Sequence, residues 1–269
     1  MLLAKRNLNP TNGGRYFWFS YQAPERALRD QPYIHLVRDG AAFAELAPVL
    51  GSMGYGYGGL LLNFPPRPSL GTPPVDIPPM TPGDLLVLAT RPPMSDEEED
   101  ERRKVARSHT SLEEMVLAVL HPFFEICSRS HVKLSRTLSA RLPKGLANRA
   151  NVLFASYLNA SYKFYQSYAA AEWDEPDKPN TTLTYLLYMP NAWPDGPSLL
   201  LSFGMGGVET LIWNLLLRTQ HSSLLEEIVA GGQRRVIMGE MTAPADSQLP
   251  LLLQADAYEL TLVANISLP

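Results

Sequence analysis

The chain has 269 residues, of which 45% are hydrophobic and 19% are charged. A chain of this length and composition can bury a sizeable apolar core, and its length fits one large domain or two small ones. The formal net charge at pH 7 is -4. Nucleic acids and anionic membrane surfaces attract proteins with a basic field, so this charge balance makes nucleic acid an unfavoured partner.

Two features of the sequence bear on the cellular setting. The single cysteine, Cys127, cannot form an intrachain disulfide, which agrees with a reducing compartment. The first residues contain no apolar core of signal-peptide length, and no apolar stretch reaches the roughly 18 residues that a membrane span needs. We therefore expect a soluble, cytoplasmic protein that does not associate with membranes.

The first ninety residues carry strand, turn and helix signals in close succession. The aromatic stretch RYFWFSYQ, followed by Pro24, is typical of a strand. Apolar residues at helical spacing after Asp39 predict a short helix. The glycines of 51–59 predict a loop, and the prolines of 65–83 predict an extended surface segment. Strands are expected at 15–22, 32–37, 60–64 and 83–90, and the helix at 39–50.

Three helices are predicted in the centre of the chain. The first starts with a capping-box pattern at Ser95, followed by favourably spaced acidic and basic residues. Pro122 must kink or restart the second, whose apolar face includes Cys127 as an inert core thiol. The third repeats aromatic residues every three or four positions, which favours a core or a subunit interface. The helices are expected to begin near 95, to cover 110–138 and to cover 146–173.

The last ninety residues predict a hairpin followed by a strand–helix–strand unit. The turn PDGP at 194–197 lies between two apolar, β-rich segments, which favours an antiparallel pair. The glycines at 231 and 232 are suited to ending a helix. Strands are expected at 181–189, 198–203, 234–242 and 257–268, and the helix at 208–229.

This order of elements predicts an α/β or α+β fold. We expect a mixed β-sheet, a central helical segment and a C-terminal strand–helix–strand unit. A single domain over 1–269 is the simplest organisation. The alternative subdivision has a β-rich part at 1–93 with the proline-rich loop, a helical part at 94–173 and a mixed part at 181–269.

The stretch LLLSFGMGGVETL is the best candidate for a binding site. An apolar strand meets Gly204, Gly206 and Gly207 just before the predicted helix. Backbone N–H groups of such a loop, together with the helix dipole, attract phosphate or carboxylate groups. Glu209 and Thr210 follow at the start of the helix, where Glu209 would repel an anion but suit a ribose hydroxyl, a cation or an amine.

The same glycines have a purely architectural explanation. The spacing matches neither the dinucleotide-binding nor the P-loop fingerprint, since Glu209 stands where a third glycine would fall. Ser202 does not lie in a nucleophile-elbow motif. The glycines then serve to make a tight turn and to let the helix pack closely on the sheet. Both interpretations remain open at this point.

Glu240, in the predicted strand VIMGEMT, is a second candidate acid. If the 198–242 unit is a right-handed crossover with adjacent strands, Glu209 and Glu240 would meet at the carboxyl ends of two parallel strands. Such a pair can hold a cation or divide acid and base roles. The alternative is that Glu240 is a surface residue at a strand end. The five histidines have no metal-ligand spacing, so we assign no metal site.

Two functions from different classes fit the sequence. The first is a soluble intracellular interaction or regulatory protein that acts through contacts with protein partners or with itself. The second is an enzyme or small-ligand-binding protein with an anion, nucleotide or metal site at the 204–210 loop. No catalytic residue and no cofactor can be named, because no nucleophile or base stands out. We therefore favour the first.

Overall fold

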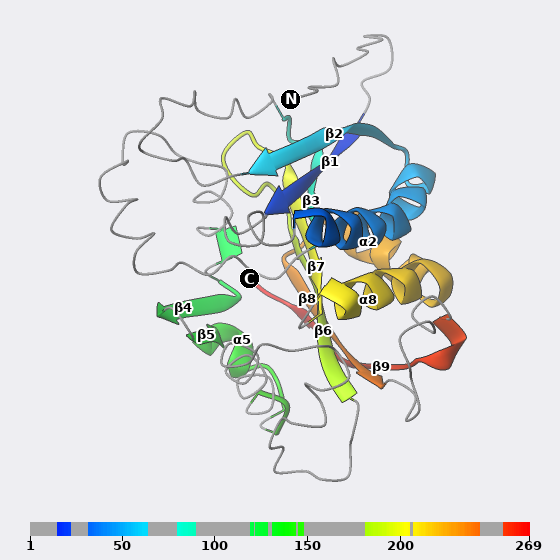
Figure 1. Cartoon of the computed structure of the whole chain (residues 1–269). Helices are drawn as coiled ribbons and strands as arrows, with labels where there is room; N and C mark the ends of the chain where they lie inside the picture. Colours follow the sequence, from blue (N-terminus) through cyan, green and yellow to red (C-terminus); the bar gives the residue numbers. More distant parts are fainter. Residues whose placement is uncertain are drawn as a thin grey trace.

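A computed structural model gives the architecture of the chain (Figure 1). It describes ten segments of the chain. They are 15–22, 32–63, 80–89, 119–120, 122–128, 131–143, 145–147, 181–204, 207–242 and 255–269.

A seven-stranded mixed sheet forms the centre of the molecule, in the order β2-β1-β3-β7-β6-β8-β9. The first four strands in this order, β2, β1, β3 and β7, are parallel to one another. The pairs β7–β6, β6–β8 and β8–β9 are antiparallel. The strands are β1 (Arg15–Gln22), β2 (Tyr55–Asn63), β3 (Leu85–Leu88), β6 (Thr181–Met189), β7 (Ser198–Phe203), β8 (Arg235–Thr242) and β9 (Glu259–Ser267).

Different elements cover the two faces of this sheet (Figure 1). Two helices that pack together, α2 and α8, lie on one side, and a small antiparallel hairpin with α5 lies on the other. The covering elements are α2 (Pro32–Ser52), β4 (Phe124–Ser128), β5 (His131–Leu134), α5 (Arg136–Ser139), α8 (Gly207–Gln220) and α9 (Ser222–Ala230), with a short 3-10 turn at Ala255–Ala257.

The side of the sheet under α2 and α8, which we call the helix face, is one of two hydrophobic cores. Leu46 of α2 and Trp213 of α8 are both fully buried in it. The helices are also joined by an ion pair between Arg218 and Glu45, 2.6 Å from Nε to Oε2. The buried sheet residues of this core are Tyr55, Leu85, Val87, Leu186, Tyr188, Leu200 and Ile237.

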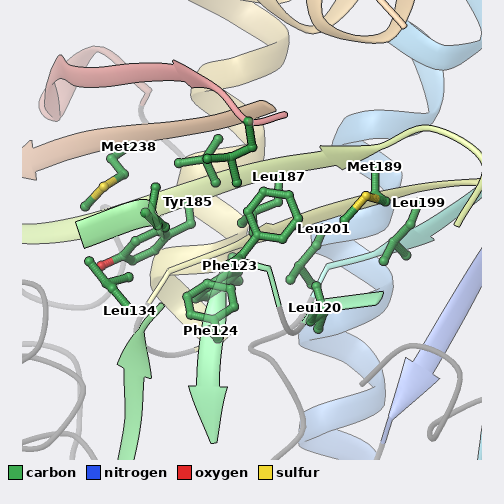
Figure 2. Packing of buried hydrophobic residues seen from close by; sticks show 14 of the residues in the cluster. Leu120, Phe123, Phe124, Leu134, Tyr185, Leu187, Met189, Leu199, Leu201 and Met238 are labelled. Atoms are coloured by element: carbon green, nitrogen blue, oxygen red, sulfur yellow. The ribbon is translucent and has the colours of Figure 1, made fainter. Parts of the chain in front are cut away.

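The opposite side, which we call the hairpin face, holds the second core. Figure 2 shows Phe123 and Phe124 reaching from the start of the hairpin toward the sheet. The rings of Phe124 and Tyr185 pack edge to face, with their centroids 6.3 Å apart. The rings of Tyr185 and Phe203 are stacked, with their centroids 4.9 Å apart. The sheet residues of this core are Leu86, Leu88, Leu183, Tyr185, Leu187, Met189, Leu199, Leu201, Phe203, Val236 and Met238.

The predicted fold class is confirmed: the chain combines helices with a mixed parallel and antiparallel sheet. The predicted strands at 15–22, 181–189 and 198–203 have the observed bounds, and the last two pair antiparallel as expected. Strands from both ends of the chain share one sheet. The C-terminal unit is confirmed in part, because its helix is divided into α8 and α9 at His221.

The predicted strand at 32–37 is wrong. These residues are the first part of α2, which continues through the predicted short helix to Ser52. Pro32 is the first helical residue, where its fixed φ and missing N–H do no harm. The loop prediction over 51–59 is wrong for its second half, because β2 begins at Tyr55 directly after Gly54, whose φ is +87°.

The second central helix is wrong over 124–134, whereas residues 119–120 and Arg136–Leu138 are helical. Residues 124–134 form the antiparallel hairpin β4–β5, in which Ile126 pairs with Val132. Pro122 prevents a helix from continuing, and the β-branched and aromatic residues that follow favour strands. Cys127 therefore lies in β4 and not on a helix. The helix expected to begin near 95, most of the helix over 146–173 and the proline-rich segment 65–83 lie largely outside the described residues.

Gly239 of β8 tests how closely α8 approaches the sheet. A Cβ there would lie 2.8 Å from Thr184 Oγ1, 2.8 Å from a Leu260 methyl carbon and 3.3 Å from the Trp213 ring. We expect Gly239→Ala to lower the free energy of unfolding by about 1–3 kcal/mol, because this core has no room for the methyl group.

Gly40, within α2, is the matched control, since its Cβ would meet nothing within 4 Å. Gly40→Ala should raise the free energy of unfolding by about 0.5–1 kcal/mol through helix propensity. Urea unfolding measures both variants. Equal stability of Gly239→Ala and the unmodified chain would contradict the close approach.

Candidate functional site

The junction between β7 and α8 brings three of the predicted site residues together. A Cβ on Gly204 would lie 2.4 Å from Glu209 Cβ and 2.9 Å from the Glu209 carbonyl carbon. The backbone N–H of Gly204 donates to Thr210 Oγ1 at 3.0 Å. Only glycine therefore allows the first turn of α8 to lie against the end of β7, which is the architectural role considered above.

The polar groups of this junction are buried. Glu209 is 3% exposed and Thr210 is 2% exposed. Glu209 lies in the first turn of α8, where the helix dipole favours a carboxylate. Because the Gly204 N–H is bonded to Thr210 and a carboxylate stands beside it, the junction is better suited to a cation, an amine or a hydroxyl than to a phosphate.

A second buried polar contact lies one turn further along α8. Asn214 is fully buried, and its Nδ2 donates to the Ala42 carbonyl of α2 at 3.0 Å. The Ser202 hydroxyl of β7, also fully buried, donates to Asn214 Oδ1. This side chain therefore joins α2, α8 and β7. Sequence reasoning missed it, because a single asparagine in an apolar helix carries no motif.

Glu240 does not belong to this group. The strands β7 and β8 are parallel, but the hairpin partner β6 lies between them, so the expected adjacency is wrong. Glu240 pairs with Leu183, and Leu183 belongs to the core of the hairpin face. Its side chain therefore starts from the side of the sheet opposite to α8, whereas Glu209 belongs to α8 itself. The two carboxylates do not meet as a pair on one face.

The remaining predicted residues can also be placed. Gly207 is the first residue of α8, and Gly206 lies outside the described residues. Over the described segments, no group of three or more histidine, cysteine, aspartate or glutamate residues is arranged to hold a metal ion. The described part of the candidate site is thus Gly204, Gly207, Glu209 and Thr210, supported by Ser202 and Asn214.

Strand β9 is a different kind of candidate site. It is the last strand at one edge of the described sheet, and none of its nine residues is fully buried. By contrast, all nine residues of β6, two strands away, are buried. Leu262 in β9 is one of two large hydrophobic side chains exposed on the described surface, at 37%. Sequence reasoning recognised this strand but had no signal that it lies at an edge, with no described strand on its outer side.

Comparisons with known proteins add no identity to this geometry. No family model, no curated protein and no solved structure matches the chain. Among the residues that the structure describes, no helix combines the length and apolar character needed to cross a membrane. The β7–α8 junction and the edge strand β9 are therefore the two features of the described structure that bear on function.

Thr210→Val tests the hydrogen bond at the junction. Valine keeps the shape of threonine but leaves the buried Gly204 N–H without this acceptor. We expect the free energy of unfolding to fall by about 1–3 kcal/mol, measured by urea unfolding. Thr210→Ser should recover most of the loss.

Thr219→Val supplies the control on the same helix. The Thr219 hydroxyl donates to the Leu215 carbonyl within α8 at 2.8 Å, near the exposed end of the helix. Its loss should change the free energy of unfolding by less than about 0.5 kcal/mol. If Thr210→Val and Thr219→Val change the free energy of unfolding equally, the Gly204–Thr210 hydrogen bond stabilises the fold no more than an ordinary bond within the helix.

Proposed function

We propose that this chain is an intracellular interaction or regulatory protein that works through contacts with other polypeptide chains. The contact surface that we propose is the open edge of the sheet at β9. The observation that supports it most is that every residue of this strand is exposed or half-exposed, with the exposed Leu262 next to its centre. Extended segments of other proteins bind to such edges by adding a strand.

The chemistry of the edge agrees with this proposal. Natural sheets usually protect an edge with lysine, proline, a short strand or a bulge. Strand β9 has nine residues, longer than the usual five or six, and contains no lysine, arginine or proline. Its protection consists of Glu259 at the first position, a bulge opposite Met238 and Gly239, and Arg141, which donates to the Ser267 carbonyl at the last position. An edge of this length with so little protection is suited to accept a further strand.

A photo-cross-linking amino acid at Leu262 tests the proposal in the source cells. Because the side chain is exposed on the proposed surface, ultraviolet light should join the protein to a second polypeptide, seen as a heavier band and identified by mass spectrometry. The same amino acid at Ala230, exposed at the end of α9, is the control and should give no such band. Equal yields at both positions, or none at Leu262, would overturn the proposal.

A small-ligand-binding or enzymatic role at the 204–210 loop is the second candidate. It is favoured by the two buried polar residues, Glu209 and Thr210, at the end of a strand and the start of a helix. The carboxylate directs this candidate toward nucleoside or sugar hydroxyls, amines and cations.

A thermal-shift screen against nucleosides, nucleotides, amines and divalent metals tests this second candidate. A ligand present at 100 times its Kd adds about 2.7 kcal/mol, which raises the melting temperature by a few degrees. Glu209→Gln should abolish the shift, while Glu226→Gln, at an exposed position of α9, should keep it. If no compound raises the melting temperature, the glycine loop has a structural role only and the second candidate is wrong.

A further inference from the structure

The charged residues around β9 are unevenly distributed along the strand. Asp256 and Glu259, both exposed, lie at its N-terminal end. At its C-terminal end, Arg141 Nη1 donates to the Ser267 carbonyl and Arg234 Nη1 donates to the Pro269 carbonyl at 3.1 Å. One end of the open edge is thus acidic and the other is basic.

Neither of these arginines forms an ion pair with a side-chain carboxylate among the described residues. Arg141 and Arg234 are both exposed, and Arg234 is bonded to the main-chain oxygen of the last residue, Pro269. A third arginine at this end is Arg235, whose Nε donates to Asn265 Oδ1 at 2.7 Å. Its Nη1 forms an ion pair with Glu227 Oε1 at 2.9 Å, so Glu227 compensates its charge. The main-chain bonds of Arg141 and Arg234 hold their guanidinium groups beside the last residues of the strand.

We propose that β9 pairs antiparallel with β9 of a second copy of this chain, so that the two sheets become continuous across a two-fold axis. This inference deepens the proposed function and rests on it. An antiparallel pair brings the acidic end of each strand against the basic end of the other. A parallel pair would place like charges together, which is destabilising.

The charge pattern favours a second copy over an unrelated partner because it is complementary to itself. In a two-fold interface the same surface serves both subunits, so each charge must find its opposite on the identical strand. With the centre of β9, near the bulged residue Val263, on the axis, the Glu259 end of each strand lies opposite the Ser267 end of the second copy. The carbonyl of Ser267 is the acceptor of Arg141, so each interface contains two equivalent Glu259–Arg141 approaches. Complementary charges of this kind fix register and suppress wrong partners.

The mass of the purified full-length chain in solution tests the proposal. Light scattering over a range of concentrations should give a species of twice 29.9 kDa. Glu259→Arg should raise the dimer dissociation constant about tenfold or more, because two like-charge approaches replace two favourable ones. Arg141→Glu should do the same, and the double variant should return to within about threefold of the unmodified chain. Glu226→Arg, an equal charge change on α9, should leave the dimer unaffected.

A cross-linking variant keeps the test independent of charge reversals that disturb folding. Val263→Cys places a thiol near the two-fold axis, close to the same thiol of the second copy. Mild oxidation should then give a covalent dimer on a non-reducing gel. The unmodified chain, with Cys127 alone, and Glu226→Cys should remain monomeric on that gel.

The outcomes separate this inference from the proposed function. A monomer at every concentration, or a dimer that neither responds to Glu259→Arg nor cross-links through Val263→Cys, overturns self-pairing. If the Leu262 cross-linker still joins a different polypeptide, the proposed function survives and only the identity of the partner is wrong. If that cross-linker joins nothing either, both proposals fail.

Discussion

The amide of Asn214 is the interaction on which the arrangement of the helix face depends. It connects α8 to the Ala42 carbonyl of α2 and to the Ser202 hydroxyl of β7, although α2 and α8 lie at opposite ends of the sequence. A fully buried amide is costly unless its donor and acceptor are both bonded. The two helices and the strand must therefore adopt one relative position, and this position brings the start of α8 against Gly204.

This close packing accounts for Gly204 at the end of β7 and for Gly239 in β8. The missing Cβ of Gly204 and that of Gly239 both give room to α8, one at its first turn and one beside Trp213. The Glu209 carboxylate, which belongs to the first turn of α8, would repel an anion bound at this junction. Gly204 thus has a sufficient structural reason in the packing of α8 against β7.

With both faces of the central strands covered, the edges are the parts of the sheet that remain available for contacts. The central strands β6 and β7 are buried at every residue, because α2 and α8 cover one side and the hairpin covers the other. At β9 no residue is buried, and among the described strands it has a neighbour on one side only. The unpaired backbone groups of such an edge are able to bind a further strand. One end of this strand is acidic and the other is basic, so a strand that pairs with it needs the opposite charge at each end.

The sequence by itself determined the buried strands and the class of fold. Strands can be predicted for apolar, β-rich runs such as TTLTYLLYM and SLLLSF, which are bounded by turn residues. In these runs local β-propensity and burial both favour a strand. It did not determine short apolar segments such as 32–37, where periodicity over six residues fits a helix and a strand equally. The positions of Glu240, Asn214 and β9 were decided only by tertiary structure. Which face, which neighbour and which edge a residue occupies depends on strand order, and strand order is set by contacts between distant parts of the chain.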